Sequence, residues 1–388
     1  MTNKWNEIKN ISSGLRGLGI IGLTDITGTI ISALFWLYLA ALLGAEQYGQ
    51  ITYFVSIGSI VATVSLLGST NMLSVYVPKK IQLESTVNII SIIVGLIAFV
   101  TLFFIFSNLS LSIYVIGMIF VGLASTEILA AKQYNSHPKY LITSKILMVG
   151  LSIGLYHIIG TDGIILGIGL SLFPYLIRIY HTFKKITIDF SLLRPRWKSY
   201  TESFILSISL AFKGSIDKIV IGQMVGFTIL GNYQLGFQLL GIMNMLPIIV
   251  FSYILPHDAG GTPNKKLKRL VILSAVGIAI MGIVLAPIII PHIFPNYIDV
   301  VEVIQIFSIS IIPFTIAMIF MSEFLGDEKI RIVLVGNTIF IVVMVSSIII
   351  LGNMFGINGI ALSMVLADSA EVIFYFIIKR LQIKKKLI

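Results

Sequence analysis

The stretch "FILSISLAFKGSIDKIVIGQMVGF", residues 204–227, poses the problem that decides the fold of this chain. It is apolar and long enough to cross a bilayer, which takes about 20 residues. Yet Lys213, Asp217 and Lys218 lie in its middle, and each charge at the centre of a membrane helix costs roughly 2.5–3.5 kcal/mol on insertion scales. Such residues are tolerated where they face protein or water. The stretch therefore indicates a helix that lines the interior of a larger membrane protein.

The composition of the whole chain agrees with a membrane location. Its 388 residues are 57% hydrophobic and only 11% charged, whereas soluble domains carry about 25% charged residues. The chain has no cysteine, which excludes disulfides, thiolate metal sites and thiol catalysis. The net charge of +10 is explained by membrane orientation, so we expect no nucleic-acid partner.

Apolar stretches of spanning length recur along the chain and predict an all-α membrane protein with twelve transmembrane helices. They are far too long for barrel strands of about 9–11 residues. The stretches fall near 17–43, 49–76, 87–106, 110–131, 141–160, 163–182, 203–225, 231–255, 269–290, 301–323, 331–351 and 357–378.

The positions of the basic residues test this number of spans. With the N-terminus in the cytoplasm, 25 of the 27 Lys and Arg residues fall in cytoplasmic segments, and the other two are Lys213 and Lys218. The predicted external loops carry acids instead, namely Glu46, Asp162, Asp299 and Glu302. An excess of Lys and Arg in cytoplasmic loops is the rule for membrane proteins. The pattern thus predicts twelve spans with the N- and C-termini both cytoplasmic.

The longest polar stretch, residues 181–200, divides the chain into two six-helix lobes. We expect an N-terminal lobe at 1–190, with helices 1–6, and a C-terminal lobe at 191–388, with helices 7–12. An even number of helices per lobe gives both lobes the same orientation in the membrane.

A short glycine pattern recurs in the two lobes. Gly44 and Gly49 form G-x4-G between the first two spans, and Gly226 and Gly231 repeat it 182 residues later, after the seventh span. Parallel repeats of this kind are a transporter architecture.

Catalytic motifs are missing from the sequence. It contains no G-x-S-x-G, no H-E-x-x-H and no phosphate-binding G-x4-G-K-[ST]. We therefore expect no catalytic residues, no metal site and no enzyme activity.

The charged residues of the seventh span have two interpretations. Lys213 and Asp217 are four residues apart and share a helix face, whereas Lys218 lies about 100° away. They form either an intrahelical ion pair or the wall of a wet cavity. In a cavity wall, the excess of cations favours an anionic ligand.

The first span carries a polar stripe that includes Asp25. Gly22, Thr29 and Ser32 lie on the same face at helical spacing. Either Asp25 bonds across to another packed helix, or it lies on a cavity wall as the partner of a cation or as a proton or sodium carrier.

The last span carries two acids, Asp368 and Glu371, three residues apart, and Asn337 lies in the span before it. Acidic and amide oxygens at membrane depth suit a monovalent cation. The alternative for Glu371 is an ion pair with Lys379, nearer the cytoplasmic end.

Residues 215–260, "SIDKIVIGQMVGFTILGNYQLGFQLLGIMNMLPIIVFSYILPHDAG", resemble the seventh and eighth helices of polysaccharide flippases. These flippases belong to the multidrug/oligosaccharidyl-lipid/polysaccharide (MOP) exporter superfamily. The pattern is an acid and a base followed by glycines, Gly-x-Tyr and a closing proline, at Asp217, Lys218, Gly222, Gly226, Gly231, Tyr233 and Pro256. "LYLAALLGAEQYGQITYFVSIGSIVATVSLLG", "FPNYIDVVEVIQIFSISIIP" and "FGINGIALSMVLADSAEVIFYF" extend the resemblance over the whole chain.

The resemblance implies a flippase that moves a lipid-linked oligosaccharide from the cytoplasmic to the external leaflet by alternating access, in a bilayer and as a monomer. Lys213 and Lys218, helped by Arg16 at the mouth of the first span, would contact the diphosphate of the carrier lipid. Asp217, Asp368, Asn337 and Asp25 would bind a coupling ion, Na⁺ or H⁺, and no other cofactor is implied. The peptidoglycan-precursor branch of the superfamily has two further helices that this sequence does not show.

Two other functions remain open. A cation-coupled multidrug exporter of the same superfamily would use an acidic pocket, and Asp25 keeps that alternative open. A membrane glycosyltransferase or polymerase would need large external loops with catalytic acids, and the predicted external loops are short.

The topology leads to a prediction that reporter fusions can check. Cytoplasmic reporters are expected to be active at 1–12, 132–140, 184–200, 258–268 and 380–388, and external reporters at 44–48 and 292–300. The physical reason is the restriction of loop Lys and Arg to one side. A fusion at residue 190 that reports an external location would contradict the topology.

Overall fold

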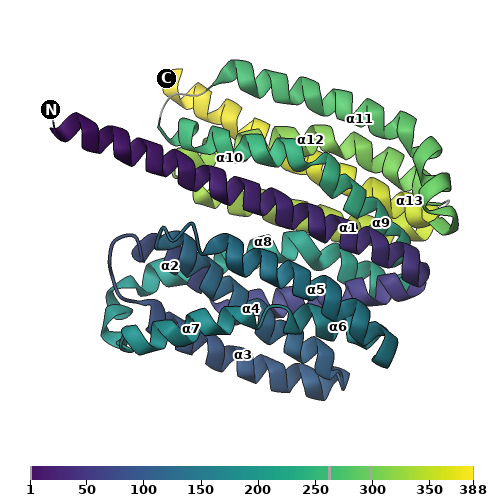
Figure 1. Ribbon diagram of the computed structural model, residues 1–388. Helices are drawn as coiled ribbons and strands as arrows, with labels where there is room; N and C mark the ends of the chain where they lie inside the picture. The colour runs from purple at the N-terminus through teal and green to yellow at the C-terminus, as the bar shows by residue number, and fades with distance from the viewer. Residues whose placement is uncertain (1, 261–263, 298, 388) are drawn as a thin grey trace. The chain divides into compact units, whose positions relative to one another are not determined.

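The computed structural model describes the backbone of residues 2–260, 264–297 and 299–387. Side chains are described from residue 19 to residue 382, apart from 252, 256, 259, 261–263, 296 and 298. Every regular element in these ranges is helical (Figure 1). The α-helices are α1 (Thr2–Leu66), α2 (Ser69–Tyr76), α3 (Glu84–Phe106), α4 (Leu109–Ala130), α5 (His137–Ile159), α6 (Thr161–Leu170), α7 (Pro174–Lys185), α8 (Trp197–Met224), α9 (Phe227–Met243), α10 (Met245–Ala259), α11 (Lys265–Ile293), α12 (Val300–Gly326) and α13 (Ile330–Leu387). Three short 3₁₀ turns lie at Phe190–Leu192, Arg194–Arg196 and Pro295–Tyr297.

The helices are those of a multi-pass membrane protein. Among the described residues, eight helices are long and apolar enough to cross a membrane, or nine if the bent pair formed by α9 and α10 is one span. This number is lower than the predicted twelve, and the number of spans and the side of the termini stay predictions.

Each of the two longest helices is interrupted by one glycine with non-helical backbone. In α1 the break is at Gly44, with φ 74° and ψ 172°. In α13 it is at Gly356, with φ 58° and ψ −137°. Only glycine reaches such positive φ values at little cost. The sequence predicts a loop between two spans at both points.

The chain forms two compact units that are interleaved along the sequence. Unit 1 contains Met1–Phe35 and Phe54–Ala211, and unit 2 contains Trp36–Tyr53 and Phe212–Ile388. The end of the first predicted span and the start of the second thus pack with the C-terminal half of the chain. The division into transport lobes near residue 190 stays a prediction.

Unit 1 is held by α4, which packs against α2, α3, α6 and α7. Buried side chains from α2, the start of α3 with the residue before it, the segment before α8 and α8 itself form one apolar cluster, made of Met72, Leu83, Val87, Leu193 and Tyr200. This cluster fixes the polar segment that links α7 to α8 onto the rest of unit 1.

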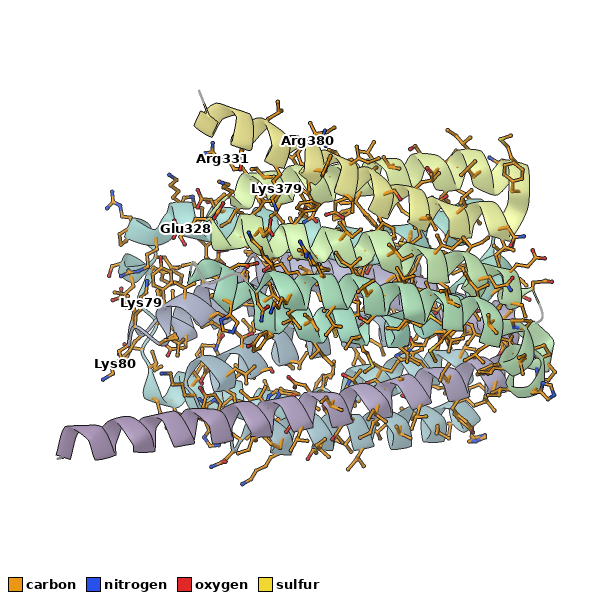
Figure 2. The ribbon with its side chains drawn as sticks, turned by 90° about the horizontal axis from the view of Figure 1, so that it is seen from above. Lys79, Lys80, Glu328, Arg331, Lys379 and Arg380 are labelled. Atoms are coloured by element: carbon orange, nitrogen blue, oxygen red, sulfur yellow. The ribbon has the colours of Figure 1, made fainter. Side chains whose placement is uncertain are left out.

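Unit 2 is organised around α12, which packs along α9, α10, α11 and α13 (Figure 1). The Tyr297 hydroxyl donates a 2.8 Å hydrogen bond to the carbonyl of Ala40 and so ties α1 to the turn before α12. Figure 2 shows Arg331 at one end of α13 lying near Lys379 and Arg380, because the two arms of α13 run back on each other at Gly356.

The repeated glycine pattern forms a reciprocal contact within unit 2. A Cβ added to Gly49 would lie 1.9 Å from the carbonyl oxygen of Phe227, and one added to Gly231 would lie 1.8 Å from that of Ala45. The obstacle is backbone in both cases, so neither position has room for a side chain. The two G-x4-G segments therefore let the start of α9 and the arm of α1 after Gly44 touch along their backbones.

We predict that Gly231→Ala destabilises the protein by about 1–3 kcal/mol, the usual cost of overpacking, because a backbone carbonyl cannot move aside as a side chain can. Thermal unfolding in detergent measures this. Gly241→Ala in the same helix is the matched control, since nothing lies within 4 Å of its Cβ position. Equal melting temperatures for the two variants would contradict the proposed backbone contact.

Candidate functional site

The three charges in the middle of α8 all lie in unit 2 and all have partners there. They form two adjacent ion-pair groups, one centred on Lys213 and the other on Asp217 and Lys218. Their partners come from α9 and from both arms of α13. A membrane helix with three charges is therefore stabilised by neighbouring helices rather than exposed to lipid, as charged residues at membrane depth require.

The first group surrounds the ammonium of Lys213. Its Nζ lies 2.6 Å from Glu371 Oε2 and donates to Asn337 Oδ1 at 3.2 Å. The same ammonium lies 4.6 Å from the ring centre of Phe340, within cation–π range. The Tyr375 hydroxyl donates to the other oxygen of Glu371 at 2.9 Å. Lys213 therefore bridges α8 to both arms of α13.

A glycine makes room for one of these hydrogen bonds. A Cβ at Gly336 would lie 2.4 Å from the hydroxyl oxygen of Tyr375. Glycine at this position lets the tyrosine pass close to the first arm of α13, and its hydroxyl then reaches Glu371 on the second arm.

The second group joins Asp217 to its neighbour in sequence. Lys218 Nζ lies 3.1 Å from both carboxylate oxygens of Asp217 and donates to the carbonyl of Gly214 at 3.0 Å. It also lies 3.9 Å from the ring centre of Phe237. The Tyr233 hydroxyl donates to Asp217 at 2.7 Å. Both α8 residues are buried.

Asp368 is close enough to both groups to interact with them. The residue is only 3% exposed, and it interacts electrostatically with Lys213 and Glu371 of the first group and with Tyr233 of the second. With all five charged side chains ionised, the combined cluster holds three carboxylates against two ammonium groups. A buried charge without a partner is costly, so the cluster favours uptake of one further positive charge.

The structure changes the pairing that helix spacing alone suggested. Lys213 pairs with Glu371 and not with Asp217, although Lys213 and Asp217 are four residues apart. Lys379 pairs with Glu323 on α12 and not with Glu371. The reason is tertiary, because α13 brings a buried carboxylate up to Lys213 from a neighbouring helix. The tyrosine partners were missed, although Tyr375 follows Glu371 by the four residues that place two side chains on one helix face.

Asp25 and its partner belong to unit 1. Asp25 Oδ1 lies 2.8 Å from Nε2 of His137, the first residue of α5, and the Asp25 side chain is 53% exposed whereas that of His137 is buried. The histidine Nδ1 is buried and has no hydrogen-bond partner. Asp25 thus bonds to a residue of another helix, which is the first of the two interpretations given above; the second placed it on a cavity wall. The side chain of Arg16, the third predicted substrate contact, lies outside the described residues.

Other buried ion pairs lie near helix ends in each unit. In unit 1 Arg178 on α7 binds Glu127 on α4 at 2.7 Å, and Thr182 donates to the same carboxylate. In unit 2 Lys268 binds Asp258 at 2.8 Å and Glu323 at 3.0 Å.

Within the described residues no group of three or more His, Cys, Asp or Glu side chains could hold a metal ion.

Known structures share this architecture. A lipid II flippase MurJ in an inward closed conformation superposes with a TM-score of 0.78 at 14% identity, over 92% of this chain and 87% of that chain. An inward-facing multidrug resistance MATE family transporter of the MOP superfamily gives 0.68 at 14% identity, over 92% and 95%. The eukaryotic MATE transporter AtDTX14 gives 0.58 at 14% identity, over 97% and 96%. No protein-family profile and no curated protein sequence matches the chain.

These likenesses confirm the resemblance to the MOP exporter superfamily at the level of the fold. The chain is a multi-pass, all-α membrane protein with the fold of MOP flippases and transporters. At 14% identity the likeness concerns the fold and not the residues of the site.

We predict that Tyr375→Phe lowers the free energy of unfolding by about 1.5–3 kcal/mol, because it removes a hydrogen bond to a buried carboxylate. Thermal or denaturant unfolding in detergent measures the loss. Tyr38→Phe is the control, because it makes the same chemical change at a residue that is about half exposed. Indistinguishable stability of the two variants would mean that the Tyr375 hydroxyl does not support Glu371.

Proposed function

We propose that the protein is a flippase that moves a lipid-linked, polyprenyl-diphosphate oligosaccharide from the cytoplasmic to the external leaflet by alternating access. The observation that carries the proposal is the charged cluster of α8 inside a MOP-type fold. A carrier-lipid diphosphate cannot cross hydrocarbon unaided. Ammonium groups held by protein at membrane depth can replace its hydration, while the polyprenyl tail remains in lipid.

The proposal includes twelve spans in two six-helix lobes with both termini cytoplasmic. The breaks at Gly44 and Gly356 support it, because each turns one long helix into two arms of spanning length. The 28-residue α8 is also long enough to span, although its three central charges are atypical of a membrane helix. With the bent pair of α9 and α10 as one span, these features are consistent with twelve.

In this proposal Lys213 and Lys218 contact the diphosphate, together with Arg16. The structure favours Lys213 as the first contact, because 21% of its side chain is exposed, against 8% for Lys218. Charge-assisted contacts are worth about 1.5–3 kcal/mol each. Lysine binds phosphate as a point charge, without the paired geometry of arginine.

The coupling ion, Na⁺ or H⁺, is proposed to bind near Asp368 and Asn337, with Asp217 beside them. The excess of one carboxylate in this cluster supports the uptake of one positive charge. Asp25 is the proposed counterpart in the N-terminal lobe, where its half-exposed carboxylate is paired with His137.

A cation-coupled multidrug exporter is the second candidate function. The MATE transporters among the similar structures and the exposed carboxylate of Asp25 favour it. The flippase is preferred because the superposition with the lipid II flippase is better than those with the MATE transporters.

Transport of a lipid-linked oligosaccharide in reconstituted vesicles tests the proposal. We expect the wild type to translocate it. Lys218→Gln is expected to weaken substrate binding about tenfold or somewhat more, which corresponds to the loss of at least 1.4 kcal/mol. Lys329→Gln is the control, because Lys329 pairs on the surface with the exposed Asp327.

The coupling residues are tested in the same vesicles. Asp217→Asn and Asp368→Asn are expected to abolish the dependence of transport on an ion gradient, and Asp25→Asn is the parallel test for the first lobe. Unchanged gradient dependence in well-folded variants would refute the coupling role. Export of cationic drugs without movement of the oligosaccharide would favour the multidrug exporter instead.

A further inference from the structure

The group around Lys213 has the composition of a cation site that the chain fills with its own side chain. Asn337 Oδ1 and Glu371 Oε2 are hard oxygen donors that suit a small monovalent cation. Both residues are buried, and Asp368 adds a further carboxylate within electrostatic range. The position that a free cation would take between the two oxygens is held by the ammonium of Lys213.

The surroundings are built for a positive charge rather than for the lysine alone. The Tyr375 hydroxyl orients the second oxygen of Glu371, and Phe340 faces the ammonium with its ring. The Nδ2 of Asn337 is buried without a hydrogen-bond partner. The contact of this amide with the cation is therefore made by its oxygen, Oδ1, which accepts the hydrogen bond from Lys213.

We propose that Lys213 is a tethered cation, which fills the site made by Asn337, Glu371 and Asp368 and excludes free Na⁺ as long as it remains there. Lys213 is suited to such a role because its side chain is the most exposed of the cluster, at 21%, whereas Glu371 is 1% exposed. The ammonium can therefore leave the site, whereas the buried oxygens remain behind.

One consequence rests on the proposed function. If the diphosphate of the substrate draws Lys213 away from Glu371, it opens the site to Na⁺. Substrate and ion then bind in a coupled manner, because one lysine has two alternative anionic partners. The two positions of Lys213 thus couple the two affinities: binding of the substrate raises the affinity for the ion, and binding of the ion raises the affinity for the substrate.

The test compares thermal unfolding in sodium chloride with unfolding in choline chloride at equal ionic strength. In the absence of substrate we expect the melting temperature of the wild type to be the same in both salts, because Lys213 then occupies the site. That of Lys213→Met is expected to rise with sodium concentration, because a ligand that binds only the native state stabilises it by mass action. Direct binding of radioactive sodium should appear in the same variant.

Three further variants serve as controls. Lys213→Met/Glu371→Gln removes both charges and should show no sodium response. Lys213→Arg keeps the positive charge and should resemble the wild type. Lys329→Met deletes a lysine from a surface pair with the exposed Asp327 and reports any general effect of lost charge.

The outcomes separate the alternatives. A sodium response of the wild type equal to that of Lys213→Met would overturn the tethered-cation role. If Lys213→Met folds only in sodium, the role is supported. If it fails to fold in both salts while the double variant folds, sodium does not replace the ammonium and the proposal is wrong.

Farnesyl diphosphate is the probe for the exchange. We expect its addition to make the wild type respond to sodium. A wild type that binds the probe but still ignores sodium, beside a responsive Lys213→Met, would overturn the exchange and the substrate role of Lys213 while the tethered cation stands. A sodium response together with failed oligosaccharide transport would overturn the flippase proposal alone.

Discussion

The contact on which the rest of the site depends is the ion pair between Lys213 and Glu371. Removing one partner of a buried pair costs about 3–5 kcal/mol, because the remaining charge has no compensation. This contact joins α8 to α13, and Asn337, Tyr375 and Phe340 are arranged around it. The lysine makes α8 unfavourable in lipid, so the same residue that opposes insertion of the helix also determines its neighbours.

The second group is also an ion pair, but both of its charges come from α8. Asp217 and Lys218 neutralise each other within one helix, and α9 adds the Tyr233 hydroxyl and the ring of Phe237. Lys213, by contrast, depends on another helix for its carboxylate. The first group therefore depends on the position of α13 relative to α8, whereas the pair in the second group does not. Asp368, which is also on α13, interacts electrostatically with both groups.

Backbone constraints position these helices. The breaks at Gly44 and Gly356 let two long helices fold back, and the second break is what brings Asn337 and Glu371, on opposite arms of α13, to the same ammonium. The contacts at Gly49 and Gly231 hold α1 and α9 at backbone distance. A side chain larger than hydrogen at either glycine would separate the elements that surround α8.

The sequence alone determined the class of the protein and the list of candidate residues. Hydropathy and the rarity of charge in apolar spans are local properties, so they can be read without a structure, and they identified the α8 charges, Asp368, Glu371 and Asn337. Resemblance identified the fold. Which acid binds which base was decided only by tertiary structure. Lys213 and Asp217 satisfy the helix-spacing rule, yet Lys213 bonds to a carboxylate 158 residues away. Asp25 likewise bonds to His137, which no local pattern singles out. A charge buried in a membrane protein pairs with the closest opposite charge or polar group in space, and the packing of the helices determines which group is closest.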